Sequence, residues 1–72
     1  MSFDFETLDQ LISFRAILDQ TFGERTQLKN EYLDAEIYNF LGGIELWLIY
    51  IPLGYRIEIS YGKGDHLQKI YN

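Results

Sequence analysis

The sequence predicts an α+β fold: an N-terminal amphipathic helix packed on one face of a small antiparallel β-meander. Three observations predict this class. Apolar residues recur with a helical period near the N-terminus, apolar and polar residues alternate in the second half, and glycine-containing turns separate the alternating runs. The meander is expected to have three strands, with a fourth at the C-terminus as an alternative. The chain has 72 residues, which predicts a single domain over residues 1–72.

The predicted helix spans roughly residues 4–22. Thr7 and Gln10 have the spacing of a capping box, and Gly23 is well placed to end the helix. Within it, apolar side chains fall on one side at 100° per residue, so that one stripe is expected to be buried. The stripe consists of Leu8, Leu11, Phe14, Leu18 and Phe22.

Residues 24–30 are polar and are expected to form a connection. Residues 31–41 fit a strand and a helix almost equally well, because apolar positions with either period can be traced through them. We favour the strand, since Gly42-Gly43 between two alternating runs indicates a two-residue hairpin loop. As a helix, the same residues would cover the second face of the sheet.

The second half of the chain contains the clearest strands. Ile44 to Ile51 is rich in β-branched and aromatic residues, and Tyr55 to Tyr61 alternates apolar with polar side chains. Pro52-Leu53-Gly54 between them predicts a turn. Residues 65–72 fit a short helix and an edge strand equally well.

The predicted hairpins fix which residues share a face. A Gly42-Gly43 loop sets Ile37 opposite Leu48, and the second turn sets Leu48 opposite Ile59. That face is nearly all apolar and is expected to receive the helix. The opposite face combines apolar and acidic side chains, which we predict to bind a partner: Asp34, Glu36, Tyr38, Glu45, Trp47, Ile49, Ile51 and Glu58.

The central part of that second face is Trp47, Ile49 and Ile51, and nothing in the predicted fold is certain to cover it. Three covers are open: the C-terminal residues of the same chain, a second copy, or a different protein. In the last two cases, this face would be an interface of apolar anchors with a polar rim.

Charge and composition narrow the class of partner. The net charge is −5, which disfavours direct binding to nucleic acid. The longest apolar run, Leu46 to Leu53, is far shorter than the roughly 20 residues of a membrane span, so no membrane association is expected. The start of the chain is acidic and resembles no signal peptide, which predicts a cytoplasmic protein.

Residue types argue against catalysis. The chain has no cysteine and a single histidine, His66, and no motif orients a nucleophile, a base or a metal. We therefore expect no enzyme, no cofactor and no metal site. The predicted function is a small acidic protein-binding module that inhibits or titrates a partner, as immunity proteins, antitoxins and phage counter-defence proteins do. Such a partner could present a basic surface, like that of a nucleic-acid enzyme; the alternative is a homodimeric accessory subunit.

Overall fold

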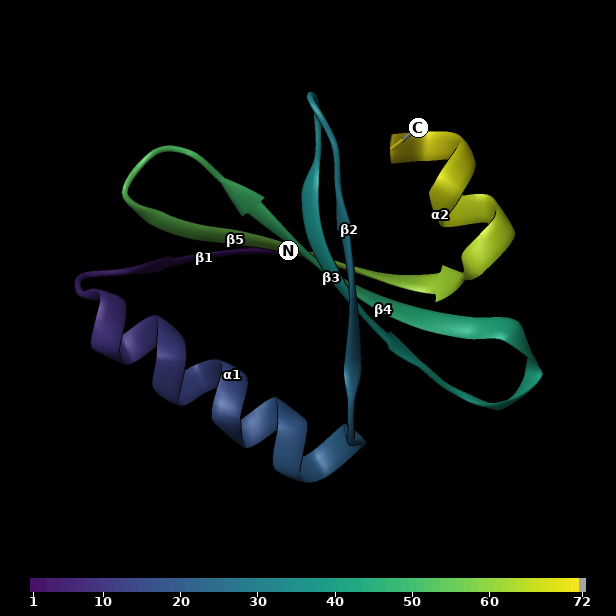
Figure 1. The fold of residues 1–72 in the computed structure, drawn as a ribbon, viewed down its shortest axis with the longest axis horizontal. Coiled ribbons are helices and arrows are strands. Elements are labelled where there is room, and N and C mark those ends of the chain that lie inside the picture. Colours follow the sequence, from purple (N-terminus) through teal and green to yellow (C-terminus); the bar gives the residue numbers. More distant parts are fainter. Residues whose placement is uncertain (72) are drawn as a thin grey trace.

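The structure is a computed structural model and describes residues 1–71. It confirms the α+β class, with five antiparallel strands in the order β1-β5-β4-β3-β2 and two helices (Figure 1). The elements in chain order are β1 (Ser2–Phe5), α1 (Leu8–Phe22), β2 (Arg25–Lys29), β3 (Asp34–Asn39), a 3₁₀ turn (Leu41–Gly43), β4 (Ile44–Ile51), β5 (Tyr55–Lys63) and α2 (Gly64–Tyr71). The expectation of three or four strands was wrong.

The two strands that were not predicted form the edges of the sheet. Ser2–Phe5, whose last two residues were expected to begin the helix, pairs with β5, and Arg25–Lys29, expected to be a connection, pairs with β3. Each edge strand has hydrogen-bonded neighbours on one side only. Edge strands tolerate many polar residues, so apolar and polar residues alternate little along them and the sequence does not reveal the strand.

Helix α1 begins after the Thr7 capping box and ends before Gly23, the two signals that the sequence contains for its ends. The amide of Gln10 donates to the hydroxyl of Thr7 at 3.2 Å, and the reciprocal bond completes the capping box. At the other end, the amide of Gly23 donates to the carbonyl of Asp19 at 2.9 Å, with a positive φ of 88° that suits glycine. Of the predicted stripe, Leu11, Phe14 and Leu18 pack on the sheet with Leu11 buried, whereas Leu8 and Phe22 are 49% and 40% exposed.

Residues 34–39 are a strand, as favoured, but its predicted register was wrong by one residue. Ile37 lies opposite Trp47 and not opposite Leu48. The reason is the loop: the amide of Phe40 donates to the carbonyl of Ile44, so that three residues, not two, lie between the last paired positions. A shift of one residue moves every β3 side chain to the other face.

The β4–β5 register was predicted correctly. Tyr50 lies opposite Ile57 and Leu48 lies opposite Ile59. The regular alternation in β5 and the Pro52–Gly54 turn specify this pairing locally, which is why it could be read from the sequence.

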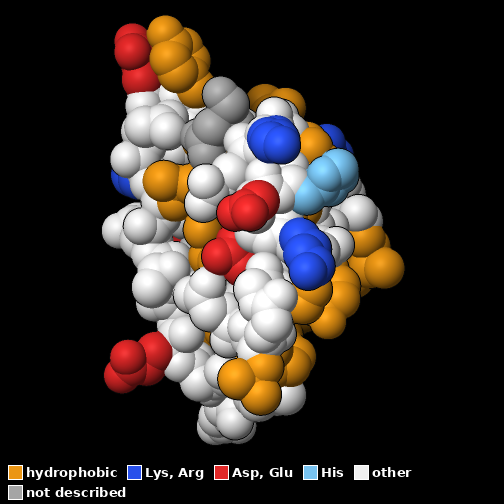
Figure 2. Space-filling view, turned by 90° about the vertical axis from the view of Figure 1, so that its right-hand side faces the viewer, with side chains coloured by type: hydrophobic (Ala, Val, Ile, Leu, Met, Phe, Trp, Pro, Cys, Tyr) orange, Lys and Arg blue, Asp and Glu red, His pale blue; other side chains and the backbone are white. Residues whose placement is uncertain are grey.

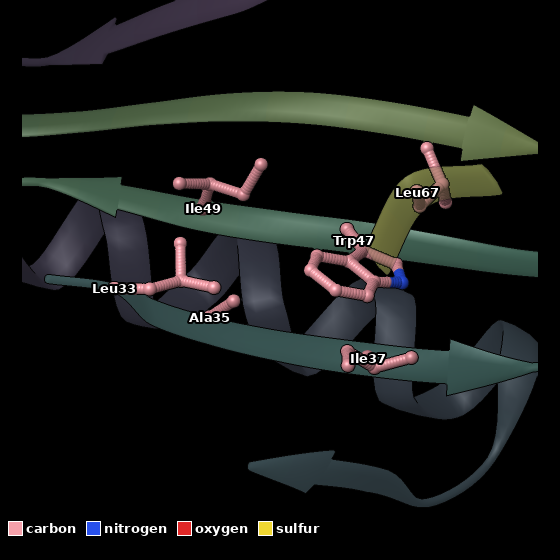
Figure 3. Packing of buried hydrophobic residues seen from close by; sticks show 6 residues of the cluster. All are labelled: Leu33, Ala35, Ile37, Trp47, Ile49 and Leu67. Carbon is pink, nitrogen blue, oxygen red and sulfur yellow. The ribbon is translucent and has the colours of Figure 1, made fainter. Parts of the chain in front are cut away.

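The C-terminal residues form helix α2, which covers the sheet face opposite to α1. The Trp47 ring is fully buried and stacks on Tyr71 with 5.7 Å between ring centroids. Leu67 packs into the same cluster, which Figure 3 shows with residues of β3 and β4. The Tyr71 hydroxyl is 2.5 Å from the Ser60 Oγ atom and fixes the end of the helix. The same chain therefore covers both faces of its sheet.

The first residue of α2 is in close contact with β4. A Cβ atom at Gly64 would lie 2.6 Å from the Glu45 carboxylate, so a side chain here would require that carboxylate to move. The same carboxylate accepts a hydrogen bond from the Trp47 indole nitrogen at 2.9 Å. Neither helix within residues 1–71 has the length and apolar content that crossing a bilayer requires.

Candidate interaction surface

The residues predicted to bind a partner do not form one surface. The shifted β3 register places Asp34, Glu36 and Tyr38 on the face of α1, where Tyr38 is fully buried. The other five remain on the face of α2: Glu45, Trp47, Ile49, Ile51 and Glu58.

On the α2 face, the two central anchors are inside the protein. Trp47 and Ile49 belong to the cluster under α2 (Figure 3). Ile51, Glu45 and Glu58 are partly exposed around them. Of the three possible covers for this face, the one observed is the chain's own C-terminal helix.

On the α1 face, Asp19 and Glu36 belong to a polar network that fixes α1 to β2 and β3. The Arg25 guanidinium donates hydrogen bonds to the Asp19 carboxylate of the helix and to the Glu36 carboxylate of β3, and it contacts both directly. The Tyr38 hydroxyl donates to the Asp19 Oδ1 atom at 2.6 Å. Thus one carboxylate from the helix and one from the sheet share a single cation.

A second arginine enters the same network from α1. Arg15 lies 3.5 Å from the Glu36 carboxylate and stacks over the Tyr50 ring at 5.9 Å, while the Tyr50 hydroxyl donates to Glu36. Glu36 therefore has three partners, two of them cationic. These contacts engage Arg15, Asp19, Arg25 and Glu36 with one another.

The network shifts the pKa values of its members. The Tyr38 hydroxyl and the Arg25 guanidinium hold the pKa of the Asp19 carboxyl below its ordinary value of 3.8. Burial, reinforced by the hydrogen bond to Asp19, raises the pKa of Tyr38 from 10.0 to about 12. Burial and the hydrogen bond to Glu36 raise the pKa of Tyr50 as well.

These shifts predict how the Tyr38→Phe variant responds to pH. At neutral pH, the variant is expected to lose about 1–2 kcal/mol of unfolding free energy with the hydrogen bond to a carboxylate. Because folding raises the Tyr38 pKa from 10.0 to about 12, this contribution is complete below the lower value and disappears as the pH rises through the higher one. Urea unfolding at pH about 8 and about 11.5 should therefore show a smaller difference between wild type and variant at the higher pH. An unchanged difference would contradict the contact.

An open hollow of about 560 Å³ lies beside the network, lined by Asp19, Gly23, Glu24, Arg25 and Glu36. Its three carboxylates exceed its one guanidinium, so a cationic side chain would fit it electrostatically better than an anion. Within residues 1–71, no group of three or more histidine, aspartate or glutamate side chains is arranged to hold a metal ion.

Large exposed apolar side chains gather where the end of α1 meets the β3–β4 hairpin. Phe22 packs edge-on against Phe40 at 5.2 Å, and Phe40 in turn against Tyr61 of β5 at 6.2 Å. Leu41, next to Phe40 at the hairpin tip, is 97% exposed, and Tyr61 is 68% exposed. These rings form a row that continues across the sheet beyond the helix.

Other exposed apolar side chains lie toward the β1 edge. Phe3 packs on Phe14 of the helix at 5.8 Å, and Ile17, one turn beyond Phe14 on the same flank, is 60% exposed. Phe3 and Tyr61 lie on the same face of the sheet. Phe3 pairs with Ile57 of β5, and Ile59 lies between Ile57 and Tyr61 along this strand. We call the group around the Phe22–Phe40 and Phe40–Tyr61 contacts the aromatic surface; it consists of Phe22, Phe40, Leu41 and Tyr61.

No charged residue belongs to the aromatic surface. Asp19, one helical turn before Phe22, nevertheless lies close by, because it accepts a hydrogen bond from Tyr38 and the Tyr38 ring contacts Phe22. Figure 2 looks onto the end of the molecule that holds α2 and the β3–β4 hairpin. It shows a band of hydrophobic side chains at the lower right, and the acidic side chains in view lie outside this band.

Sequence reasoning missed this surface for a definable reason. The predicted register placed Phe40 on the opposite face, beside Glu45, and thus away from Phe22. The signal that could have revealed it was the number of large apolar residues on the α1 face of the sheet. Tyr61 and Phe40 lie on this face in addition to the apolar residues that the stripe of the 15-residue helix already covers.

The fold and this surface together define a small α+β module with an exposed group of aromatic and aliphatic side chains. Comparisons with protein-family models, with curated proteins and with solved structures gave no match for the chain.

Proposed function

We propose that the chain is a non-catalytic protein-binding module and that the aromatic surface is its binding site. One observation carries the proposal. Both sheet faces already have a helix, yet four large apolar side chains at the end of α1 and the β3–β4 hairpin remain partly or largely exposed: Phe22, Phe40, Leu41 and Tyr61. An apolar centre rich in aromatic residues, with few charges, is typical of the part of an interface that is fully buried on binding.

The proposed consequence of binding is that the partner is inhibited or titrated, because a rigid module of this size occludes the surface it covers. A second candidate is recognition of a basic protein, such as a nucleic-acid enzyme. The acidic hollow beside Asp19, Glu24 and Glu36 favours it, since a lysine or arginine of the partner would find excess negative charge there. However, Asp19 and Glu36 are already engaged by Arg25, which weakens their attraction for another cation.

Site-specific photo-crosslinking in the native cells tests the proposal. A photo-reactive phenylalanine analogue is placed at position 41 or position 61, where exposure is high. The matched control has the analogue at position 32, because Tyr32 is 91% exposed but lies in the turn between β2 and β3, at the other end of β3.

We expect covalent protein adducts from positions 41 and 61 and none, or far fewer, from position 32. Equal yields from the three positions, or no adducts from the first two, would contradict binding through the aromatic surface. The mass of the adduct identifies whether the bound protein is a second copy or a different chain.

A further inference from the structure

We propose that helix α2 is a removable cover, which opens as a unit from a sheet that stays folded and thereby exposes Trp47. The two helices cover opposite faces of the sheet (Figure 1), but the contacts that hold them there differ in kind. The opening concerns the α2 face alone. The aromatic surface lies on the other face and keeps its contacts in both forms.

Helix α1 is fixed to the sheet by polar as well as apolar contacts. Asp19 of this helix pairs with Arg25 and accepts a hydrogen bond from Tyr38. Arg15, one turn earlier, pairs with Glu36 of β3. Lifting α1 would leave partly buried charges without their partners, which is costly. This helix is therefore expected to leave the sheet only when the whole protein unfolds.

Helix α2 has no ion pair to the sheet. Its charged and titratable side chains are exposed and make no ion pair within residues 1–71: Asp65, His66 and Lys69. Beyond its first residue, two side chains attach it. Leu67 is buried in the cluster of Trp47. Tyr71 stacks on the Trp47 ring, and its hydroxyl is hydrogen-bonded to Ser60.

The length of α2 makes the helix depend on these two side chains. It has eight residues, and a helix of this length does not persist alone in water. When Leu67 and Tyr71 leave the sheet, the whole segment therefore unfolds, and the conformational freedom that it regains offsets the apolar contact that is lost. Because α2 follows β5 directly at Gly64, the five strands can stay paired while it is open.

Opening exposes the apolar centre of the α2 face. Trp47 is fully buried in the closed form, with Leu67 beside it (Figure 3). Ile37 and Ile49 belong to the same cluster and lose part of their cover with it. The closed form hides this apolar centre, and the open form presents it. Helix α2 thus gives the protein two forms that differ in one exposed apolar face.

Native-state hydrogen exchange followed by nuclear magnetic resonance tests the inference, because one proton distinguishes opening of the cover from unfolding of the sheet. The Trp47 indole N–H belongs to a β4 residue but lies under α2, where it donates to Glu45 at 2.9 Å. If α2 opens by itself, this proton exchanges with the helix. If it does not, the proton exchanges with the strand.

We expect the indole proton and the four amides with acceptors inside the helix, residues 68–71, to exchange at similar protection. These protons should exchange about 30-fold faster or more, relative to their intrinsic rates, than the paired amides of β4. Low concentrations of urea should change their rates little, because opening of α2 exposes little surface. The β4 amides require global unfolding and should accelerate steeply with urea.

Two variants separate the two events. Glu36→Gln weakens the α1 side of the protein and should accelerate the β4 amides about tenfold, while the indole proton and residues 68–71 change by less than about twofold. Tyr71→Phe removes the hydrogen bond to Ser60 and keeps the ring on Trp47. It should accelerate the indole proton and the α2 amides about threefold to tenfold.

The inference is overturned if the indole proton and the α2 amides exchange at the protection of β4 with the same urea dependence, since α2 then unfolds only with the whole protein. Acceleration of all these protons by an equal factor in Glu36→Gln has the same meaning. It is also overturned if exchange quickens progressively toward residue 71 while the indole proton follows β4, because that pattern describes fraying of the helix end under a cover that stays closed.

Discussion

Trp47→Ala is expected to lower the free energy of unfolding by about 3–5 kcal/mol, the usual cost of removing a large buried aromatic side chain. Trp47 is fully buried between the sheet and α2, where it stacks on Tyr71 and contacts the cluster of Leu67 (Figure 3). Its removal leaves a cavity at the centre of the α2 face and a Glu45 carboxylate without its indole donor. For a chain of this length, total stability is of the order of 4–10 kcal/mol, so the variant should be close to unfolding.

The measurement is urea unfolding followed by far-ultraviolet circular dichroism, because the variant lacks its only tryptophan. Protein concentration is held constant, since dimer formation would add to the apparent stability. Tyr32→Ala is the control: this aromatic residue is 91% exposed and should change stability by less than about 0.5 kcal/mol. If Trp47→Ala costs as little as the control, α2 does not cover the sheet in the way described.

Glu36→Ala is expected to cost about 2–4 kcal/mol, more than any other carboxylate of the chain. The Glu36 side chain is 14% exposed and contacts Arg15, Arg25 and the Tyr50 hydroxyl. Without it, two guanidinium groups remain side by side in a partly buried site, and a buried hydroxyl loses its acceptor. An unpaired charge in such a position is costly because water cannot fully replace the lost partner.

Glu58→Ala provides the matched control, since it removes a partly exposed carboxylate from another strand of the same sheet. Glu58 makes no ion pair within residues 1–71, and we expect a change below about 0.5 kcal/mol. Equal losses from the two variants in thermal or urea unfolding would show that the polar network contributes nothing specific. Glu36→Gln should give an intermediate loss, because the amide can still accept from Tyr50 but attracts neither arginine.

The parts of the fold with strong local signals could be predicted. A capping box, a terminal glycine and a complete apolar stripe specify α1, and regular alternation with a proline-containing turn specifies the β4–β5 hairpin. The edge strands could not be predicted, because β1 and β2 depend on backbone pairing with one neighbour and show no clear alternation. For residues 65–71, two or three apolar positions suit both a helix and a strand, and packing on Trp47 decides between them.

The predicted binding site depended on the register of β3 against β4, which the sequence specifies only weakly. Gly42-Gly43 suits both a two-residue hairpin loop and the longer loop observed, and the difference is one residue of register. That residue moves Tyr38 and Glu36 from the predicted binding face to the α1 face and brings Phe40 beside Phe22. The expectation of an exposed apolar area was therefore reasonable in kind, but the structure locates such an area on the other side of the sheet.

Nuclear Overhauser spectroscopy tests the central claim most directly, because it reads the register of β3 against β4, which decides the residues on each face of the sheet. Our account predicts that Ile37 lies opposite Trp47 and that the Phe22 ring contacts the Phe40 ring. Contacts that place Ile37 opposite Leu48, together with the absence of contacts between Phe22 and Phe40, would contradict it.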